Sequence, residues 1–246
     1  MLTHEVDIAF SPQSRVGSLA VSNDGKIIAW SESDQSVNIS VEMEKAQKIS
    51  IESDVKGIFF QDNNLIYADD DFGVNCVDTS GETIWQCEIP GGVSLLQKCQ
   101  DFIAVVDNLG RLSTLSHHGN SLKSFDQFTS IIMILPYSNG VIVVLESGSV
   151  HFFDGQHSVW NRPARGEVGE SITNVGLTAE NKLIIGREGY ALVPGEEEAL
   201  ELEVWDVTQD SMLFRCEIKN RLLLACDDNK ITYLLSLIHI SEPTRR

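Results

Sequence analysis

Basic residues are few in this sequence of 246 residues. Its 18 lysines and arginines stand against 36 aspartates and glutamates, which gives a formal net charge of −18. A surface of this sign repels the phosphate backbone of nucleic acids and the anionic surface of membranes. We therefore expect neither nucleic acid nor a membrane among the partners, and a protein partner that carries basic residues fits the charge better.

Cysteine is scarce, and no two cysteines are spaced as CxxC. The five cysteines are Cys76, Cys87, Cys99, Cys216 and Cys226. In the hairpin around Thr79–Glu82, the simplest register places Cys76 opposite Trp85. It also places Val74 opposite Cys87, so the two thiols lie diagonally rather than paired. We expect free thiols that are buried or half-buried, a reducing compartment and a cytoplasmic location.

Long apolar runs and recognisable reaction motifs are absent too. No stretch of about 18 apolar residues could span a membrane as a helix, and the N-terminal MLTHEVDIAF lacks the regions of a signal peptide. Only Met43–Lys48 and Glu196–Leu200 have a composition that suits a helix, and both are too short to nucleate one. No GxSxG motif, phosphate-binding glycine loop or EF-hand loop is present. We predict no catalytic residues, no cofactor and no metal site.

Short strands separated by tight turns are what the sequence has instead. In Val55–Gly92, runs rich in Val, Ile, Tyr, Phe and Trp alternate with Asp, Asn and Gly, which is typical of hairpins. The predicted strands of this stretch are Gly57–Phe60, Leu65–Ala68, Val74–Asp78 and Thr83–Ile89.

The same four-strand pattern recurs along the chain. The first apolar residues of the second strands are Ile27, Leu65, Ile103, Val141, Leu183 and Leu222, which are spaced by 38, 38, 38, 42 and 39 residues. A four-stranded sheet of this size cannot bury both faces alone, so successive sheets must cover one another. This predicts an all-β fold, a β-propeller of four-stranded antiparallel blades with about six blades present. A pair of β-sandwiches is the alternative, which the regular repeats disfavour.

The repeats set the expected domain limits. We expect a propeller domain over residues 1–234, with blades 17–54, 55–92, 93–128, 129–169, 170–210 and 211–234. Tyr190–Pro194 and Leu200–Val207 are the expected outer strands of the fifth blade, and the sixth stops after its third strand. Glu5–Phe10 alternates polar and apolar residues and suits a strand that closes the ring.

The final residues do not fit the repeat. Residues 235–245, LSLIHISEPTR, resemble a translated sequencing adapter. We therefore expect the tail 235–246 to be an artefact and the natural protein to continue past residue 234.

One hairpin carries a resemblance to a known repeat. In Asp78–Trp85, an Asp is followed by a Gly three residues later and by a Trp four residues beyond that. This resembles the repeat signature of quinoprotein-like (PQQ-like) β-propellers, and Asp154–Trp160 is the counterpart in the fourth blade. The Gly suits the hairpin, and the aromatic ring is expected to wedge between neighbouring sheets. WD40-like propellers are a second relative, through the dipeptide Trp205-Asp206.

The resemblance implies two kinds of function. Quinoprotein-like propellers include dehydrogenases that bind PQQ and calcium, and also non-catalytic scaffolds. Many of the dehydrogenases carry two adjacent cysteines, and no two cysteines are adjacent in this sequence. We predict a non-catalytic scaffold for protein–protein interaction. A PQQ-dependent dehydrogenase and a sensor or structural domain of a longer protein are the alternatives.

Acidic turns between the second and third strands form the candidate site. In a propeller these turns share one rim with the connectors between blades. The candidate interaction rim consists of Asp69, Asp70, Asp71, Asp107, Glu146, Glu188 and Asp227, with Arg162 and Arg165 from the connector Trp160–Ser171. The functional interpretation of this rim is a docking surface for a basic partner or a weak cation site. The alternative is that Asp, Asn and Gly simply make tight turns there and that the arginines pair with neighbouring acids.

Overall fold

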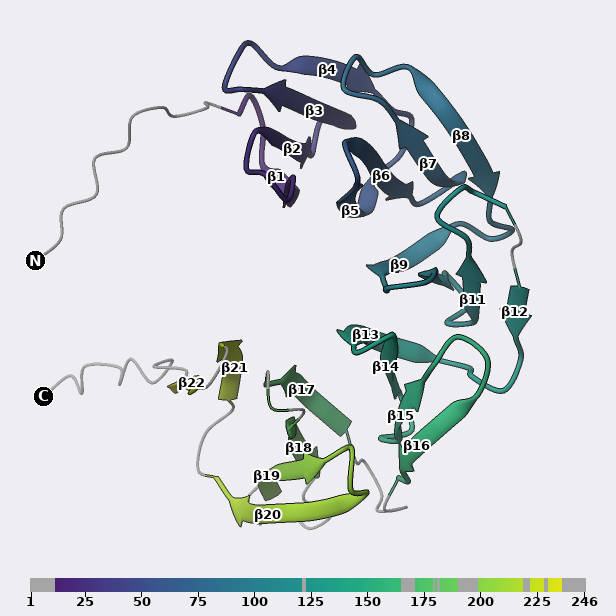
Figure 1. The fold of residues 1–246 in the computed structure, drawn as a ribbon. Helices are drawn as coiled ribbons and strands as arrows, with labels where there is room; N and C mark the ends of the chain where they lie inside the picture. Colours follow the sequence, from purple (N-terminus) through teal and green to yellow (C-terminus); the bar gives the residue numbers. More distant parts are fainter. Residues whose placement is uncertain are drawn as a thin grey trace, which may run out of the picture. The chain divides into compact units, whose positions relative to one another are not determined.

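The computed structural model describes residues 12–120, 123–164, 171–178, 180, 182–189, 199–218, 222–227 and 230–235, the last two ranges as backbone only. Strands and turns make up these ranges (Figure 1). In this part of the chain no helix is long and apolar enough to cross a membrane. The chain forms two compact units, which divide between Asn139 and Gly140 in the turn that follows β13.

Twenty of the described strands form five four-stranded antiparallel sheets, and in each sheet the strands are neighbours in sequence order. Sheet 1 contains β1 (Val16–Val21), β2 (Ile27–Glu32), β3 (Ser36–Val41) and β4 (Gln47–Ser50). Sheet 2 contains β5 (Val55–Gln61), β6 (Asn64–Asp69), β7 (Gly73–Val77) and β8 (Thr83–Glu88). Sheet 3 contains β9 (Val93–Lys98), β10 (Ile103–Asp107), β11 (Leu112–Leu115) and β12 (Lys123–Phe125).

The remaining strands follow the same plan. Sheet 4 contains β13 (Ile131–Tyr137), β14 (Gly140–Leu145), β15 (Val150–Phe153) and β16 (Ser158–Arg162). Sheet 5 contains β17 (Ser171–Leu177), β18 (Lys182–Gly189), β19 (Ala199–Asp206) and β20 (Ser211–Glu217). A two-stranded sheet of β21 (Leu222–Asp227) and β22 (Lys230–Leu235) comes last.

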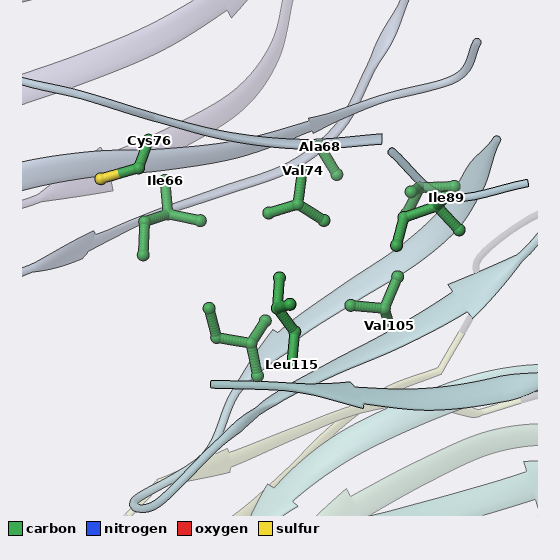
Figure 2. Close-up of a cluster of buried hydrophobic side chains, with 9 residues drawn as sticks. Ile66, Ala68, Val74, Cys76, Ile89, Val105 and Leu115 are labelled. Atoms are coloured by element: carbon green, nitrogen blue, oxygen red, sulfur yellow. The ribbon is translucent and has the colours of Figure 1, made fainter. Parts of the chain in front are cut away.

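The second strand of sheet 2 is buried on both faces. Leu65 and Tyr67 of β6 pack in a cluster with Ala29, Val37 and Ile39 of sheet 1. The alternate residues Ile66 and Ala68 pack in a second cluster with Ile103, Val105 and Leu115 of sheet 3. Figure 2 shows this second cluster, with Ile66 and Val74 facing Leu115 and Val105. The continuous apolar run of β6 thus has a physical cause, since this strand lies between two neighbouring sheets.

The predicted register of the second repeat is confirmed. Cys76 lies opposite Trp85, and Val74 lies opposite Cys87. The cysteines whose side chains are described, Cys76, Cys87, Cys99 and Cys216, are free. Burial raises the pKa of the Cys76 thiol to about 11 and that of Cys99 to about 12, because an apolar environment disfavours the thiolate.

The end of the repeat differs from the prediction. The predicted second strands at Ile27, Leu65, Ile103, Val141 and Leu183 are confirmed as β2, β6, β10, β14 and β18. However, Ser211–Glu217 pairs with β19 and belongs to sheet 5, not to a sixth blade. Leu222 then starts β21, which lies beside β17 in the same way that β5 lies beside β1. The strand at Leu222 therefore occupies the place of a first strand rather than of a second.

Several predicted segments lie outside the described residues. They are the ring-closing strand Glu5–Phe10, the outer strand Tyr190–Pro194, the rim residue Arg165 and the tail 236–246.

Candidate functional site

The turns after β2, β6 and β10 lie at one edge of sheets 1 to 3, together with the connectors between these sheets. The Ile51 N–H in the β4–β5 connector donates to the Gln35 carbonyl over 2.9 Å. The Asp70 N–H donates to the Asp54 carbonyl over 3.0 Å, and the Ile131 N–H to the Gly110 carbonyl over 3.1 Å. We define the turn rim as Ser33–Gln35, Asp70–Phe72, Asn108–Gly110 and the connectors that contact them. This arrangement of turns and connectors is the one that the sequence predicts.

Side chains also join the rim turns of neighbouring sheets. The Asn108 side-chain amide donates to Oδ1 of Asp70 over 2.9 Å, and Lys56 Nζ lies 3.2 Å from Asp70 Oδ2. The hydrogen bond from Asn108 and the charge of Lys56 lower the pKa of Asp70 below its usual value. Gly92 packs so closely that an added Cβ would lie 1.6 Å from the Asp70 carbonyl oxygen. The rim of sheets 2 and 3 is therefore one connected surface.

Buried carboxylates at the ends of the second strands stabilise these turns from inside. Asp69 is only 5% exposed. Its Oδ1 accepts hydrogen bonds from the N–H groups of Phe72 (2.6 Å) and Gly73 (3.3 Å). Its Oδ2 accepts one from the Asn75 amide over 2.8 Å. The carboxylate thus satisfies backbone donors that the turn leaves without a strand partner.

Sheet 3 repeats this arrangement, and in sheet 1 the carboxylate at the strand end instead accepts from backbone N–H groups ahead of β1. Asp107 Oδ1 accepts from the N–H groups of Leu109 and Arg111, each over 2.9 Å, and its Oδ2 accepts from Arg111 Nε over 2.7 Å. Glu32 is also buried, and it accepts from Trp30 Nε1 over 2.8 Å and from the Asn38 amide over 3.2 Å. The hydrogen bond from Trp30 is the main cause that lowers the pKa of Glu32.

The predicted rim residues therefore fall into distinct groups. Asp71 and Glu146 are exposed, and Asp70 is half-buried. Asp69, Asp107 and Glu188 are buried, so these three carboxylates do not contribute exposed charge to the predicted acidic ring, and the connector residue Arg162 is buried as well. Asp69 and Asp107 are buried because each accepts hydrogen bonds from N–H groups of the turn that follows its strand. Asp227 ends β21, where only the backbone is described.

Arg162 belongs to a buried ion-pair network inside the second compact unit. Its guanidinium, 2% exposed, binds Glu203 with two hydrogen bonds of 3.0 Å, from Nε and from Nη2, and so joins β16 to β19. Trp205 Nε1 donates to the same carboxylate over 2.9 Å, and the Trp160 and Trp205 rings meet edge-on with centroids 5.8 Å apart. Arg187 lies 3.4 Å from Glu201. This cluster stabilises the contact between sheets 4 and 5 and offers no exposed charge to a partner.

A small cavity of about 290 Å³ lies beside the turn rim in the first compact unit. It is lined by Ile89, Pro90, Asp107, Arg111, Ser113, Ser124 and Asp126. The Ile89 N–H donates to the Phe72 carbonyl over 3.1 Å, so the cavity adjoins the turn after β6. Phe72 is 44% exposed and Leu109, in the next rim turn, is 67% exposed.

Sequence reasoning missed these apolar rim residues and the cavity. A signal was present: Phe72 and Leu109 are apolar residues within acidic turns, DDDFG and DNLG, where turn chemistry favours Asp, Asn and Gly. The cavity had no such signal, because its walls come from three separate stretches of the chain, 89–90, 107–113 and 124–126. Within the described ranges, no three His, Cys, Asp or Glu side chains are placed together to hold a metal ion.

Comparison with solved structures identifies the fold. The chain matches the WD40 β-propeller domain of Doa1 with a TM-score of 0.61 and 11% identity, over 89% of this chain and 75% of that one. The fold is a β-propeller. BamB from Moraxella catarrhalis also matches this propeller, with a TM-score of 0.57 and 10% identity over 92% and 82% of the two chains.

A third propeller match is to a chain in an S. cerevisiae complex of Dbp5 bound to Nup159, Gle1, IP6 and ADP. The TM-score is 0.58 at 12% identity, and the match covers 78% of this chain and 58% of the yeast chain. This propeller thus spans 58% of the length of that chain. No protein-family profile and no curated protein sequence matches the sequence of this protein. At these identities the likeness shows the fold alone.

Proposed function

We propose that this chain is a non-catalytic β-propeller module that binds another protein through the turn rim of its first compact unit. The observation that carries the proposal is the connected rim of sheets 2 and 3, with exposed Phe72 and Leu109 among acidic turn residues. Loops carried on a rigid scaffold are a common place for recognition, because the scaffold fixes their positions at little entropic cost.

The charge of the chain supports a basic partner. With a net charge of −18, the protein attracts positively charged surfaces and accelerates their association at low ionic strength. One of the matching propellers belongs to a multi-protein complex, that of Dbp5 with Nup159 and Gle1. Membership of such a complex fits a scaffold role. The proposal still rests on the rim itself, because fold alone does not determine function.

Site-specific cross-linking tests the proposal. A photoreactive amino acid replaces Leu109 on the rim, or Glu82 in the β7–β8 turn at the opposite edge of sheet 2; both positions are exposed. In native extract, we expect the probe at Leu109 to capture a discrete set of proteins that the probe at Glu82 does not. Excess unlabelled wild-type protein should abolish the capture.

Unlabelled variants used as competitors provide the matched control. Excess Asp71→Lys/Phe72→Ser protein should fail to compete, whereas Glu82→Lys protein should compete like the wild type. Equal capture at both positions, or full competition by the rim variant, would show that the rim is not the binding surface.

A further inference from the structure

We propose that the cavity beside the rim, together with Phe72 and Leu109 of the adjoining turns, binds a short peptide segment in which an apolar residue adjoins a lysine or arginine. The inference rests on the proposed function and names the partner chemistry of the same rim. The cavity of about 290 Å³ has room for one or two side chains, which is below the usual size of a site for a drug-sized ligand.

Apolar groups form one wall of the cavity, and two exposed apolar side chains belong to the turns next to it. Ile89 and Pro90 form part of its wall, and Pro90 is exposed. The backbone hydrogen bond from Ile89 to Phe72 places the exposed Phe72 turn directly beside this wall. On the other side, Asp107 and Arg111 flank the turn that presents Leu109. An apolar side chain that enters here would remove these groups from water.

The charges around the cavity favour a cation over an anion. The Asp107 carboxylate is neutralised by Arg111, whose Nη2 lies 2.6 Å away, and Asp70 pairs with Lys56. Asp71 and Asp126 are exposed, and among the described residues neither carboxylate has a hydrogen bond or an ion pair. The charged residues that line the cavity, Asp107, Asp126 and Arg111, sum to −1, and the exposed Asp71 of the adjoining turn adds another negative charge. A lysine or arginine beside the apolar anchor would compensate it.

The remaining wall suits a peptide. The hydroxyls of Ser113 and Ser124 lie 3.0 Å apart at the cavity and can exchange their mutual hydrogen bond for bonds to a peptide N–H or C=O. β12, which carries Ser124, is the outer strand of sheet 3 and is only three residues long. As the outermost strand, it has one edge without a strand partner in sheet 3, which a short partner segment can pair with.

Fluorescence anisotropy with labelled octapeptides tests this inference on the full chain. The probe peptides carry one Leu, Ile or Phe next to two Lys or Arg residues; the control peptides replace either the basic pair by Glu or the apolar residue by Ser. We expect the probe peptides to bind about tenfold more tightly than both controls. Binding should weaken as salt is raised, because screening reduces the charge attraction.

Variants of residues at the cavity and at the opposite edge of sheet 2 test where the peptides bind. Asp126→Asn and Phe72→Ser should each weaken binding about threefold or more, whereas Glu82→Gln at the opposite edge should leave it unchanged. Equal binding of the acidic control peptides, or no effect of Asp126→Asn and Phe72→Ser, would refute the inference. If proteins still cross-link at Leu109 while no probe peptide binds, the cavity inference fails and the rim proposal stands. If both signals are lost, both proposals fail.

Discussion

At the scale of single residues, the contact between Trp85 and Gly119 shows how neighbouring sheets fit together. Trp85 lies on β8 of sheet 2, half-buried against the cluster between sheets 2 and 3. Gly119 lies in the β11–β12 turn of sheet 3 with φ of +74°, and a Cβ placed on it would lie 2.4 Å from the Trp85 ring. The wedging aromatic predicted from the hairpin motif is therefore present, and the opposing glycine makes room for it.

A pair of glycine substitutions measures this contact. Gly119→Ala should lower the free energy of unfolding by about 2–4 kcal/mol, because it adds overpacking against Trp85 to the cost of a positive φ. Gly25→Ala is the matched control, since Gly25 has φ of +73° and nothing within 4 Å of an added Cβ. It should cost about 1 kcal/mol.

Denaturant unfolding of both variants gives the difference, and Trp85→Ala tests its origin. In the Trp85→Ala background the two glycine substitutions should cost the same. If Gly119→Ala still cost more unfolding free energy than Gly25→Ala in the Trp85→Ala background, the proposed contact between Gly119 and the indole ring would be contradicted.

His117 predicts a pH dependence of stability. Burial, and then the charge of Lys98, lowers the pKa of His117 below its usual value of about 6.5. Its Nδ1 lies 3.0 Å from Gln61 Oε1, which joins the β11–β12 turn to β5. As the pH falls below about 6.5, the unfolded chain takes up a proton that the folded chain resists, so the free energy of unfolding should decrease.

Unfolding curves at pH 7.5 and 5.5 measure this effect. His117→Gln should reduce the loss of stability, and only in part, because burial lowers the pKa of His151 as well. His118→Gln, in the same turn but at an exposed position, is the control and should keep the full loss. An unchanged pH dependence in His117→Gln would refute the assignment.

At the scale of elements, an apolar second strand that ends in a capping aspartate recurs in sheets 2 and 3. The final acid of each of these strands accepts hydrogen bonds from the turn that follows. The neighbours Asp69 and Asp71 separate this structural role from surface charge, because Asp69 is buried and hydrogen-bonded and Asp71 is exposed.

Alanine substitutions should resolve these two roles. Asp69→Ala should cost about 2–3 kcal/mol, because it leaves turn N–H groups and the Asn75 amide without their acceptor. Asp71→Ala should change stability by less than about 0.5 kcal/mol, as expected for an exposed position. Thermal or denaturant unfolding compares them directly, and losses of similar size would show that Asp69 is not the cap of its turn.

The ion pair of Arg162 and Glu203 is a second device, between the elements β16 and β19. Removing only one partner by Arg162→Met should cost about 3–5 kcal/mol, because a carboxylate is left buried with less compensation. The double variant Arg162→Met/Glu203→Leu should recover part of that loss. Additive losses in the double variant, measured in a double-mutant cycle, would exclude the direct coupling of the two residues.

Much of this element plan could be predicted from the sequence. The second strands were recognisable because burial on both faces produces continuous apolar runs. The predicted end of the fifth blade at Asp210 was wrong. The connection between β18 and β19 is longer than the corresponding connection in earlier repeats, so the last strand of this sheet, β20, begins only at Ser211. The burial of Asp69 and Asp107 was not predictable, because one acid in a turn can point outward or cap the backbone with the same sequence pattern.

At the scale of the whole molecule, charge and function connect through the rim. Some of the acidic residues are buried in the fold. Among them, Glu32, Asp69 and Asp107 accept hydrogen bonds from backbone and side-chain donors. The exposed remainder, such as Asp71 and Asp126, supplies the field that a basic partner would meet. The proposed binding surface is therefore one edge of the sheets and not the acidic surface in general.

Hydrogen–deuterium exchange of the chain, alone and with the protein recovered by cross-linking at Leu109, tests that claim most directly. We expect slower exchange on binding at the amides of residues 70–72, 91–92 and 108–111, and no change in the opposite turns at 79–82 and 100–101. Protection confined to those opposite turns, with the rim amides unchanged, would contradict the account.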